Sequence, residues 1–383
     1  MMFTLKMTTQ HFGVWDPTKK YIPVDIITRK GRVSSSTFSV IQPPLPSASL
    51  SQPLACPLSL RVDNIQRKNA MSTQRVAVIG ATNDGSPDRV AVVTGANKGI
   101  GLETVRQLAT AGVTVILTSR NEKRGMDAAS LLHQGGLSNV VFHPLDVQDS
   151  ESADALARYI EKEFGKLDIL VNNAGATGVV VDEDGLRALN IDPAEWLAGK
   201  AVNVVQDVIK TTYDAAKVCL DTNYNGVKRV TEALLPLLQL STSGARIVNV
   251  SSLRSELKRV PCEQRRRELG DIETLTEERI EKMLQQFLHD LENDALEANG
   301  WQKMLPAYSI SKVTLNAYTR ILAKRYPNMR INCVHPGFVY TDFNWHTGTT
   351  AVEEGAAGPV MLALLPEGGP TGCYFDCTTM AEF

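Results

Sequence analysis

The stretch Thr94-Gly95-Ala96-Asn97-Lys98-Gly99-Ile100-Gly101 joins a β-branched run, Val90–Val93, to an amphipathic segment that continues from Leu102. Its glycine spacing is typical of a loop that binds the pyrophosphate of a dinucleotide. Gly95 permits a tight turn, Gly99 lets the backbone approach the phosphates, and Gly101 allows the helix to pack closely on the strand. The free N–H groups at the helix N-terminus would point at the anion. A glycine-rich turn without a ligand is the alternative.

Around this loop, short β-branched runs alternate with helical patterns. Leu102, Val105 and Leu108 share one helix face, and Gly112 lies where that helix should end. Strands that alternate with helices predict an α/β fold with a doubly wound parallel sheet of the Rossmann type, covered on both faces. The predicted strands are Val90–Val93, Val113–Leu117, Val140–Leu145, Ile169–Val171, Ile247–Val250 and Ile331–Val334.

The end of the second predicted strand bears on the choice of dinucleotide. A site for NAD usually carries Asp or Glu at this point to hold the ribose hydroxyls. The sequence has Thr118-Ser119-Arg120 instead, and Lys98 lies in the glycine loop. Two cations and no acid predict NADP(H), because an arginine can hydrogen-bond the extra 2′-phosphate. Two solvated surface charges are the alternative.

Three further side chains have a pattern that suits proton transfer to a carbonyl. Tyr308 and Lys312 are four residues apart, so they face the same way on a helix. A nearby ammonium favours the phenolate and makes proton exchange with a tyrosine feasible. Ser252 follows the predicted strand Ile247–Val250, where a hydroxyl can bind a substrate oxygen or cap a turn. Asn223 precedes an apolar helix and, in isolation, would be an N-cap or turn residue.

Taken together, these motifs resemble the short-chain dehydrogenase/reductase family from about Val90 to the C-terminus. The family's other motifs occur in order at Asp146-Val147, Asn172-Asn173-Ala174-Gly175 and Pro336-Gly337-Phe338-Val339-Tyr340-Thr341. The chain is also similar to the plant menthol and neomenthol dehydrogenases, the salutaridine reductases and the animal monomeric carbonyl reductases within that family.

The resemblance implies a role for each matching side chain. Tyr308 would be the general acid, and Lys312 would lower its pKa and bind the nicotinamide ribose. Ser252 would orient the carbonyl, and Asn223 would hold a water in the proton relay. The cofactor would also be contacted by Asp146, Val147, Asn173, Ala174, Gly175, Pro336, Gly337, Val339 and Thr341.

The chain departs from the family pattern in ways that bear on its substrate and its oligomeric state. Ser252 and Tyr308 are 56 positions apart, and the insertion between them predicts a helix capped by Thr276. If this insertion folds over the face through which related enzymes associate, the protein would be a monomer. Phe343 and Trp345 suggest an aromatic lid for an apolar terpenoid- or alkaloid-like ketone, with loop packing as the alternative. A non-catalytic NADP(H)-binding sensor or interaction protein is the rival function.

Composition limits the other possibilities. The 383 residues have a formal charge of −2, which gives no case for a nucleic-acid partner. No apolar run is long enough for a membrane span, and the six scattered cysteines and few histidines predict no metal site.

The N-terminal residues differ in composition from the rest. Residues 1–70 hold nine Lys/Arg but three acids, have no persistent strand or helix period, and include a Ser/Pro-rich stretch. They are either a non-functional disordered extension of a cytoplasmic protein or a plastid transit peptide. Residues 71–88 would be a linker, and residues 89–383 the reductase domain.

Overall fold

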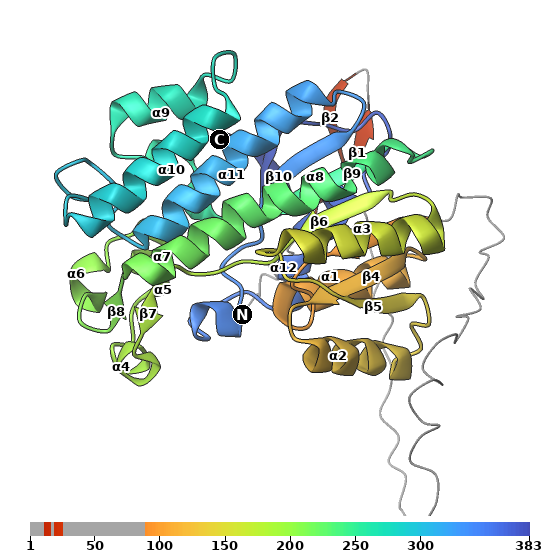
Figure 1. The fold of residues 1–383 in the computed structure, drawn as a ribbon, viewed down its shortest axis with the longest axis horizontal. Helices are drawn as coiled ribbons and strands as arrows, with labels where there is room; N and C mark the ends of the chain where they lie inside the picture. Colours follow the sequence, from red (N-terminus) through yellow and green to blue (C-terminus); the bar gives the residue numbers. More distant parts are fainter. Residues whose placement is uncertain (1–10, 17–18, 26–88) are drawn as a thin grey trace, which may run out of the picture. The chain divides into compact units, whose positions relative to one another are not determined.

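The structure, a computed structural model, describes residues 11–16, 19–25 and 89–383 (Figure 1). The chain divides into two units, residues 1–77 and 78–383. In the first unit, β1 (His11–Asp16) pairs antiparallel with β2 (Lys19–Asp25). The sequence analysis found no persistent strand or helix period in this extension, so the hairpin is a correction. The rest of the predicted extension and the linker 71–88 lie outside the described residues.

The second unit is built on an eight-stranded sheet in the order β12-β11-β10-β9-β6-β3-β4-β5 (Figure 1). All neighbouring pairs are parallel except β11 and β12, which form an antiparallel edge. The six predicted strands are confirmed to within two residues, and β11 and β12 are not among them. The strands are β3 (Val90–Val93), β4 (Thr114–Ser119), β5 (Val140–Pro144), β6 (Ile169–Asn172), β9 (Arg246–Val250), β10 (Arg330–His335), β11 (Tyr374–Asp376) and β12 (Thr379–Ala381).

Helices bury both faces of this sheet, as predicted. Alternate residues of β3 point to opposite sides: Val92 packs into one apolar core and Val93 into the other. The core around Val93 is closed by α1 (Gly99–Thr110), α2 (Glu122–Gln134) and α12 (Val352–Ala363). The core around Val92 is closed by α3 (Ser150–Phe164), α7 (Tyr213–Leu220), α8 (Gly226–Gln239) and α11 (Pro306–Arg325).

Two insertions extend this frame. The first runs from β6 to α7 and has a small core of its own that includes Leu186 and Trp196. It contains β7 (Val180–Val181), α4 (Glu183–Ala188), α5 (Pro193–Ala198), α6 (Val202–Val205) and β8 (Ile209–Lys210). The second lies before α11 and contains α9 (Glu263–Gly270) and α10 (Glu277–Glu292).

The helix predicted in the second insertion is confirmed. Thr276 caps α10, because its hydroxyl accepts a hydrogen bond from Arg279 N at 3.4 Å. Ile280 and Phe287 on its apolar face are fully buried in the core beneath it. In the described part of the chain, no helix is both long and apolar enough to cross a bilayer.

Candidate active site

A cavity of about 690 Å³ opens at the carboxyl ends of the central strands. Its size lies within the ~300–1,000 Å³ typical of small-molecule sites. Every site residue that the sequence analysis named lines it, except Asn223. These residues are Gly95, Asn97, Lys98, Gly99, Ile100, Gly101, Arg120, Asp146, Val147, Asn173, Ala174, Gly175, Ser252, Tyr308, Lys312, Pro336, Gly337, Val339, Thr341, Phe343 and Trp345.

The glycine loop has the shape of a phosphate cradle. Gly95 and Gly99 have φ values of +61° and +58°, a region that disfavours other residues. A Cβ at Gly101 would lie 2.4 Å from Asn173 Nδ2, so this glycine makes room for that amide. We expected Gly101 to let the helix pack closely on the strand. The nearest contact of this glycine is instead the Asn173 amide. No side chain caps α1, so its first N–H groups face the cavity without a side-chain acceptor, which fits a bound pyrophosphate.

Asn173 has a structural task beyond lining the cavity. Its Nδ2 donates hydrogen bonds to Thr94 O at 2.9 Å and Gly95 O at 3.1 Å. The Thr94 hydroxyl in turn accepts from the backbone N–H groups of Asn173 and Ala174. These bonds fix the glycine loop against the end of β6.

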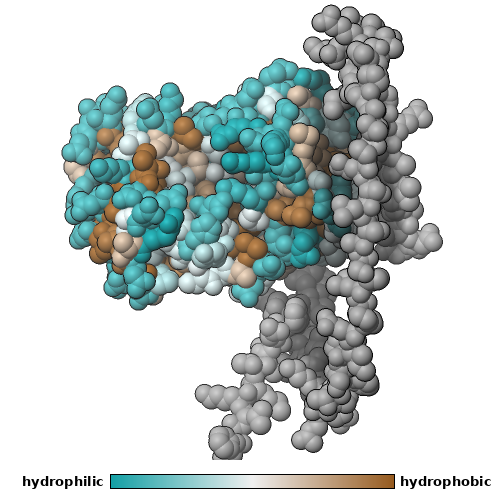
Figure 2. Space-filling model, turned by 90° about the horizontal axis from the view of Figure 1, so that it is seen from below, coloured by the Kyte–Doolittle hydropathy of each residue, from teal (hydrophilic) through white to brown (hydrophobic). Residues whose placement is uncertain are grey.

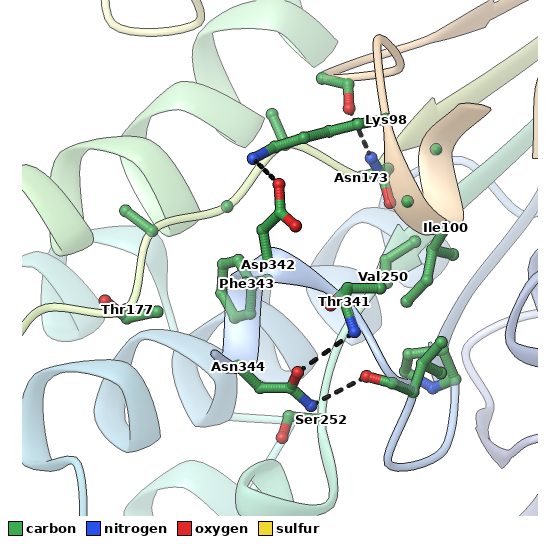
Figure 3. A pocket seen from close by; sticks show the side chains of 18 of the residues that line it. Lys98, Ile100, Asn173, Thr177, Val250, Ser252, Thr341, Asp342, Phe343 and Asn344 are labelled. Atoms are coloured by element: carbon green, nitrogen blue, oxygen red, sulfur yellow. Dashed lines mark hydrogen bonds and ion pairs between the residues drawn. The ribbon is translucent and has the colours of Figure 1, made fainter. Parts of the chain in front are cut away.

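The adenine-ribose end of the cavity carries more cations than the sequence analysis named. Arg120 is exposed at the end of β4, and Arg124, from the first turn of α2, lines the same region. Arg124 was missed because no motif marks it. Lys98 is not free: its ammonium lies 2.7 Å from the Asp342 carboxylate, and both side chains are more than half exposed (Figure 3). The hydrogen bond from Lys98 is the main reason that the pKa of Asp342 is lowered.

The clasp, residues 336–341, is held by its own loop. Asn344 Nδ2 donates to Val339 O at 2.8 Å, and Asn344 Oδ1 accepts from Thr341 N at 3.3 Å (Figure 3). A Cβ at Gly99 would lie 3.4 Å from the Thr341 methyl group, so the clasp packs against the glycine loop. Asn344 therefore supports the clasp. Sequence reasoning did not identify this role of Asn344.

The three reactive side chains come together from two elements. Tyr308 and Lys312 share one face of α11, with Lys312 Nζ 5.8 Å from the centre of the Tyr308 ring. Ser252 follows β9 and lies close enough to the Tyr308 hydroxyl to act toward a lower pKa of that group. The Ser252 hydroxyl also accepts from Arg254 N at 3.2 Å, so it caps the turn η2 (Leu253–Ser255) as well.

Burial determines the protonation of this group. It raises the pKa of Tyr308 to about 12, outweighing the effect of Ser252, which acts in the opposite direction. It lowers the pKa of Lys312 to about 8. The resemblance implied that Lys312 lowers the tyrosine pKa, whereas in this structure desolvation dominates. Near neutral pH the phenol therefore holds its proton and can act as an acid.

Asn223 lies behind the cavity wall. It is in a π-helical turn, η1 (Asp221–Asn225), that joins α7 to α8, so it is not an N-cap. Its side chain is fully buried: Oδ1 accepts from Ala176 N at 2.8 Å, and Nδ2 donates to Ala176 O and Ser311 Oγ at 2.9 Å. Asn223 thus ties the loop after β6 to the helix that carries Tyr308.

The two aromatic residues after the clasp, Phe343 and Trp345, lie in different surroundings. The Phe343 ring lies 5.8 Å from the Tyr308 ring and is 40% exposed, which suits a lid over the reactive group. Trp345 is only 9% exposed, because it packs with Trp196 in the core of the first insertion. That insertion also supplies Leu197 to the cavity wall, which no sequence signal indicated.

Comparisons with known proteins point to one family. Residues 89–262 match the family model described as short chain dehydrogenase. A (+)-neomenthol dehydrogenase of Arabidopsis thaliana is 47% identical over 299 residues, which are 77% of this chain and 98% of the relative. A mouse protein named carbonyl reductase [NADPH] 3 is 36% identical, covering 73% of this chain and 92% of the relative.

A solved structure agrees as well. Salutaridine reductase from Papaver somniferum superposes with a TM-score of 0.70 at 46% identity, and covers 75% of this chain and 99% of that one. Fold, site and similarity over nearly the whole length of these proteins lead to one conclusion: the chain belongs to the short-chain dehydrogenase family.

Proposed function

We propose that this enzyme reversibly reduces the carbonyl of a small, mainly apolar ketone or aldehyde with NADPH, a ketone giving the secondary alcohol. The convergence of Ser252, Tyr308 and Lys312 in one cavity carries the proposal. The relatives named above as neomenthol dehydrogenase and salutaridine reductase support a terpenoid- or alkaloid-like substrate. Phe343 beside Tyr308 offers an apolar surface for such a molecule.

The chain's residues divide the chemistry between them. NADPH would supply a hydride to the carbonyl carbon. The Tyr308 phenol, whose raised pKa keeps it protonated, donates its proton to the carbonyl oxygen as charge develops there. Ser252 donates a hydrogen bond to the same oxygen and orients it. Lys312 holds positive charge near the ring and is positioned by Val250 O, to which it donates at 2.8 Å.

We propose NADPH rather than NADH because of the charged residues at one end of the cavity. Arg120 and Arg124 line the end of the cavity where the second strand stops, and Lys98 approaches from the glycine loop. No acid stands at the end of β4 to hold a free ribose. The 2′-phosphate carries roughly −1.5 to −2 charges near neutral pH, so these cations favour it. The mouse relative's name includes NADPH, which agrees.

A second candidate is a sensor or interaction protein that binds NADP(H) without catalysis. It would need the glycine loop but not a tyrosine, serine and lysine in one cavity. The test is to mix the purified protein with NADPH and a panel of terpenoid, alkaloid and simple aromatic ketones and to follow NADPH absorbance. Turnover of any cyclic ketone supports the reductase. Tight NADPH binding without turnover of any panel member would favour the sensor.

We also propose that the enzyme is a monomer. The helix α10 packs on α7 and on α11, the helix that carries Tyr308, and buries its apolar residues against them. Lys228 of α8 forms ion pairs with Glu277 and Glu281 of α10 and fastens this cover. On the face seen in Figure 2, apolar residues form separate small groups among hydrophilic ones, without a broad apolar area. Light scattering tests this proposal.

The proposed compartment is the cytoplasm, with the plastid as the alternative if residues 1–70 are a transit peptide. Their basic, Ser-rich and acid-poor composition supports the plastid, while the early Asp16 and Asp25 support the cytoplasm. A fluorescent fusion of the whole chain, compared with one that begins at Met71, separates the two. Plastid fluorescence of the whole-chain fusion alone would establish a transit peptide.

A further inference from the structure

An arginine of the cavity wall has no acid to balance it. Arg254 lies in the turn η2, two residues after Ser252, and its side chain lines the cavity. Within the described part of the chain, its guanidinium has one hydrogen bond, from Nη2 to Trp196 O at 2.8 Å, and no ion pair. Burial lowers its pKa to about 10, and the guanidinium is close enough to Tyr308 for each to affect the pKa of the other.

Two other largely buried arginines of the same unit show how such a charge is normally satisfied. Arg246 donates to three backbone carbonyls, those of Ser243, Gly244 and Leu365. Arg259 pairs with the Glu256 carboxylate at 2.8 Å and donates to Leu197 O at 3.0 Å. A desolvated charge is costly unless it is paired and hydrogen-bonded. Arg254 is partly exposed and lines the cavity, so its remaining donors are open to solvent and to a molecule bound there.

A purely structural role explains part of this arrangement. Arg254 and Arg259 both donate to carbonyls near the C-terminus of α5, where a cation is favourable. That role needs one or two of the five N–H groups of a guanidinium. It does not require Arg254 to line the cavity, and Arg259 performs it from outside the cavity.

The position of Arg254 points to the substrate rather than to the cofactor. It follows β9, beside Ser252, and contacts Trp196 of the first insertion. The residues assigned to the phosphates and the adenine follow β3, β4 and β5 on the other side of β6. A planar guanidinium matches the paired oxygens of a carboxylate.

We infer that Arg254 forms a subsite for an anionic group of the substrate, most simply a carboxylate, so that the enzyme reduces ketones with an apolar ring and one acidic substituent. This inference rests on the proposed reductase function and narrows its substrate class. A neutral ketone would leave the guanidinium partly unsatisfied, so the enzyme prefers the acid to an uncharged molecule of the same shape.

The test compares cyclic keto acids, with the carboxylate at different ring positions, with their methyl esters. For at least one position, wild-type kcat/KM for the acid should exceed that for the ester by about tenfold or more. Arg254→Gln should bring this ratio to about one, and Arg254→Lys should retain part of it. Arg259→Lys, which removes the matching contact to α5 outside the cavity, is the control and should leave the ratio unchanged.

Two outcomes overturn the inference. One is that wild type uses every ester as well as its acid. The other is that Arg254→Gln, with its melting temperature and NADPH affinity intact, keeps the preference for the acid. Reduction of esters without any preference for acids would refute the Arg254 subsite alone. Absence of turnover with acids, esters and neutral ketones alike would refute the proposed reductase function as well.

Discussion

Lys312 Nζ lies 2.8 Å from the backbone oxygen of Val250, and this hydrogen bond joins the catalytic helix to the end of β9. Ser252 follows two residues later, so one contact fixes the spacing between the lysine, the serine and the strand. The same burial that makes this contact strong also lowers the lysine pKa to about 8.

That pKa predicts how reduction depends on pH. A lowered pKa means that Lys312 loses its proton above about pH 8 instead of near its ordinary value of about 10.4. The value of kcat/KM for ketone reduction should therefore be level below about pH 7.5 and fall above about pH 8. Tyr308, with a pKa of about 12, cannot cause this decline. Lys312→Arg, which keeps its charge, should be slower but lose the alkaline decline. A decline that stays at the same pH in that variant would assign it to another group.

Cofactor preference should depend on Arg120. Arg120→Asp places a carboxylate where the 2′-phosphate is expected and creates the acid that suits a free ribose. The Michaelis constant for NADPH should rise by about tenfold or more, with little change for NADH. Steady-state kinetics with both cofactors measures this. Equal use of both cofactors by wild type, or an unchanged ratio in the variant, would make Arg120 an ordinary surface charge.

The ion pair between Lys98 and Asp342 should compete with the cofactor. Because both side chains are more than half exposed, the pair itself stabilises the fold little. Asp342→Asn releases the ammonium and removes a negative charge from the cavity mouth. The Michaelis constant for NADPH should fall several-fold at low ionic strength, and the gain should shrink as salt rises. A higher constant in this variant would mean that Asp342 helps to hold the cofactor.

The first 70 residues should contribute nothing to activity. Among the residues that the structure describes, all those that line the cavity lie at Gly95 or later. A chain that begins at Met71 should match the whole chain in turnover and melting temperature, and light scattering should show a monomer. A large loss of turnover would show that the extension supports the site, and a stable tetramer would refute the monomer.

The strands were predictable because the signals that mark them are local in the sequence. The β-branched run Val90–Val93, for example, is buried on both faces and followed by a helix signal, so composition and length identify it. The edge strand β12 was missed because it is three residues long and largely exposed. The glycine loop was predicted with its residues, but the partner that requires Gly101 to be small, Asn173, lies just after β6.

What the sequence did not reveal depended on contacts between distant segments. The ion pair of Lys98 was not predicted, because its partner Asp342 lies 244 positions away. For Trp345 the sequence left a lid and loop packing open, because nothing in it pairs Trp345 with Trp196 of the insertion. Asn223 was placed in the proton relay by resemblance, and the residues that bond it, Ala176 and Ser311, carry no motif.

The most direct test of the central claim is Tyr308→Phe, assayed for NADPH-dependent reduction of a cyclic ketone that wild type turns over. The variant keeps the ring beside Phe343 and loses only the proton donor. NADPH affinity should remain at the wild-type value, while turnover should fall by at least about 100-fold. Turnover near the wild-type rate, with the cofactor bound normally, would contradict the assignment of Tyr308 as the acid.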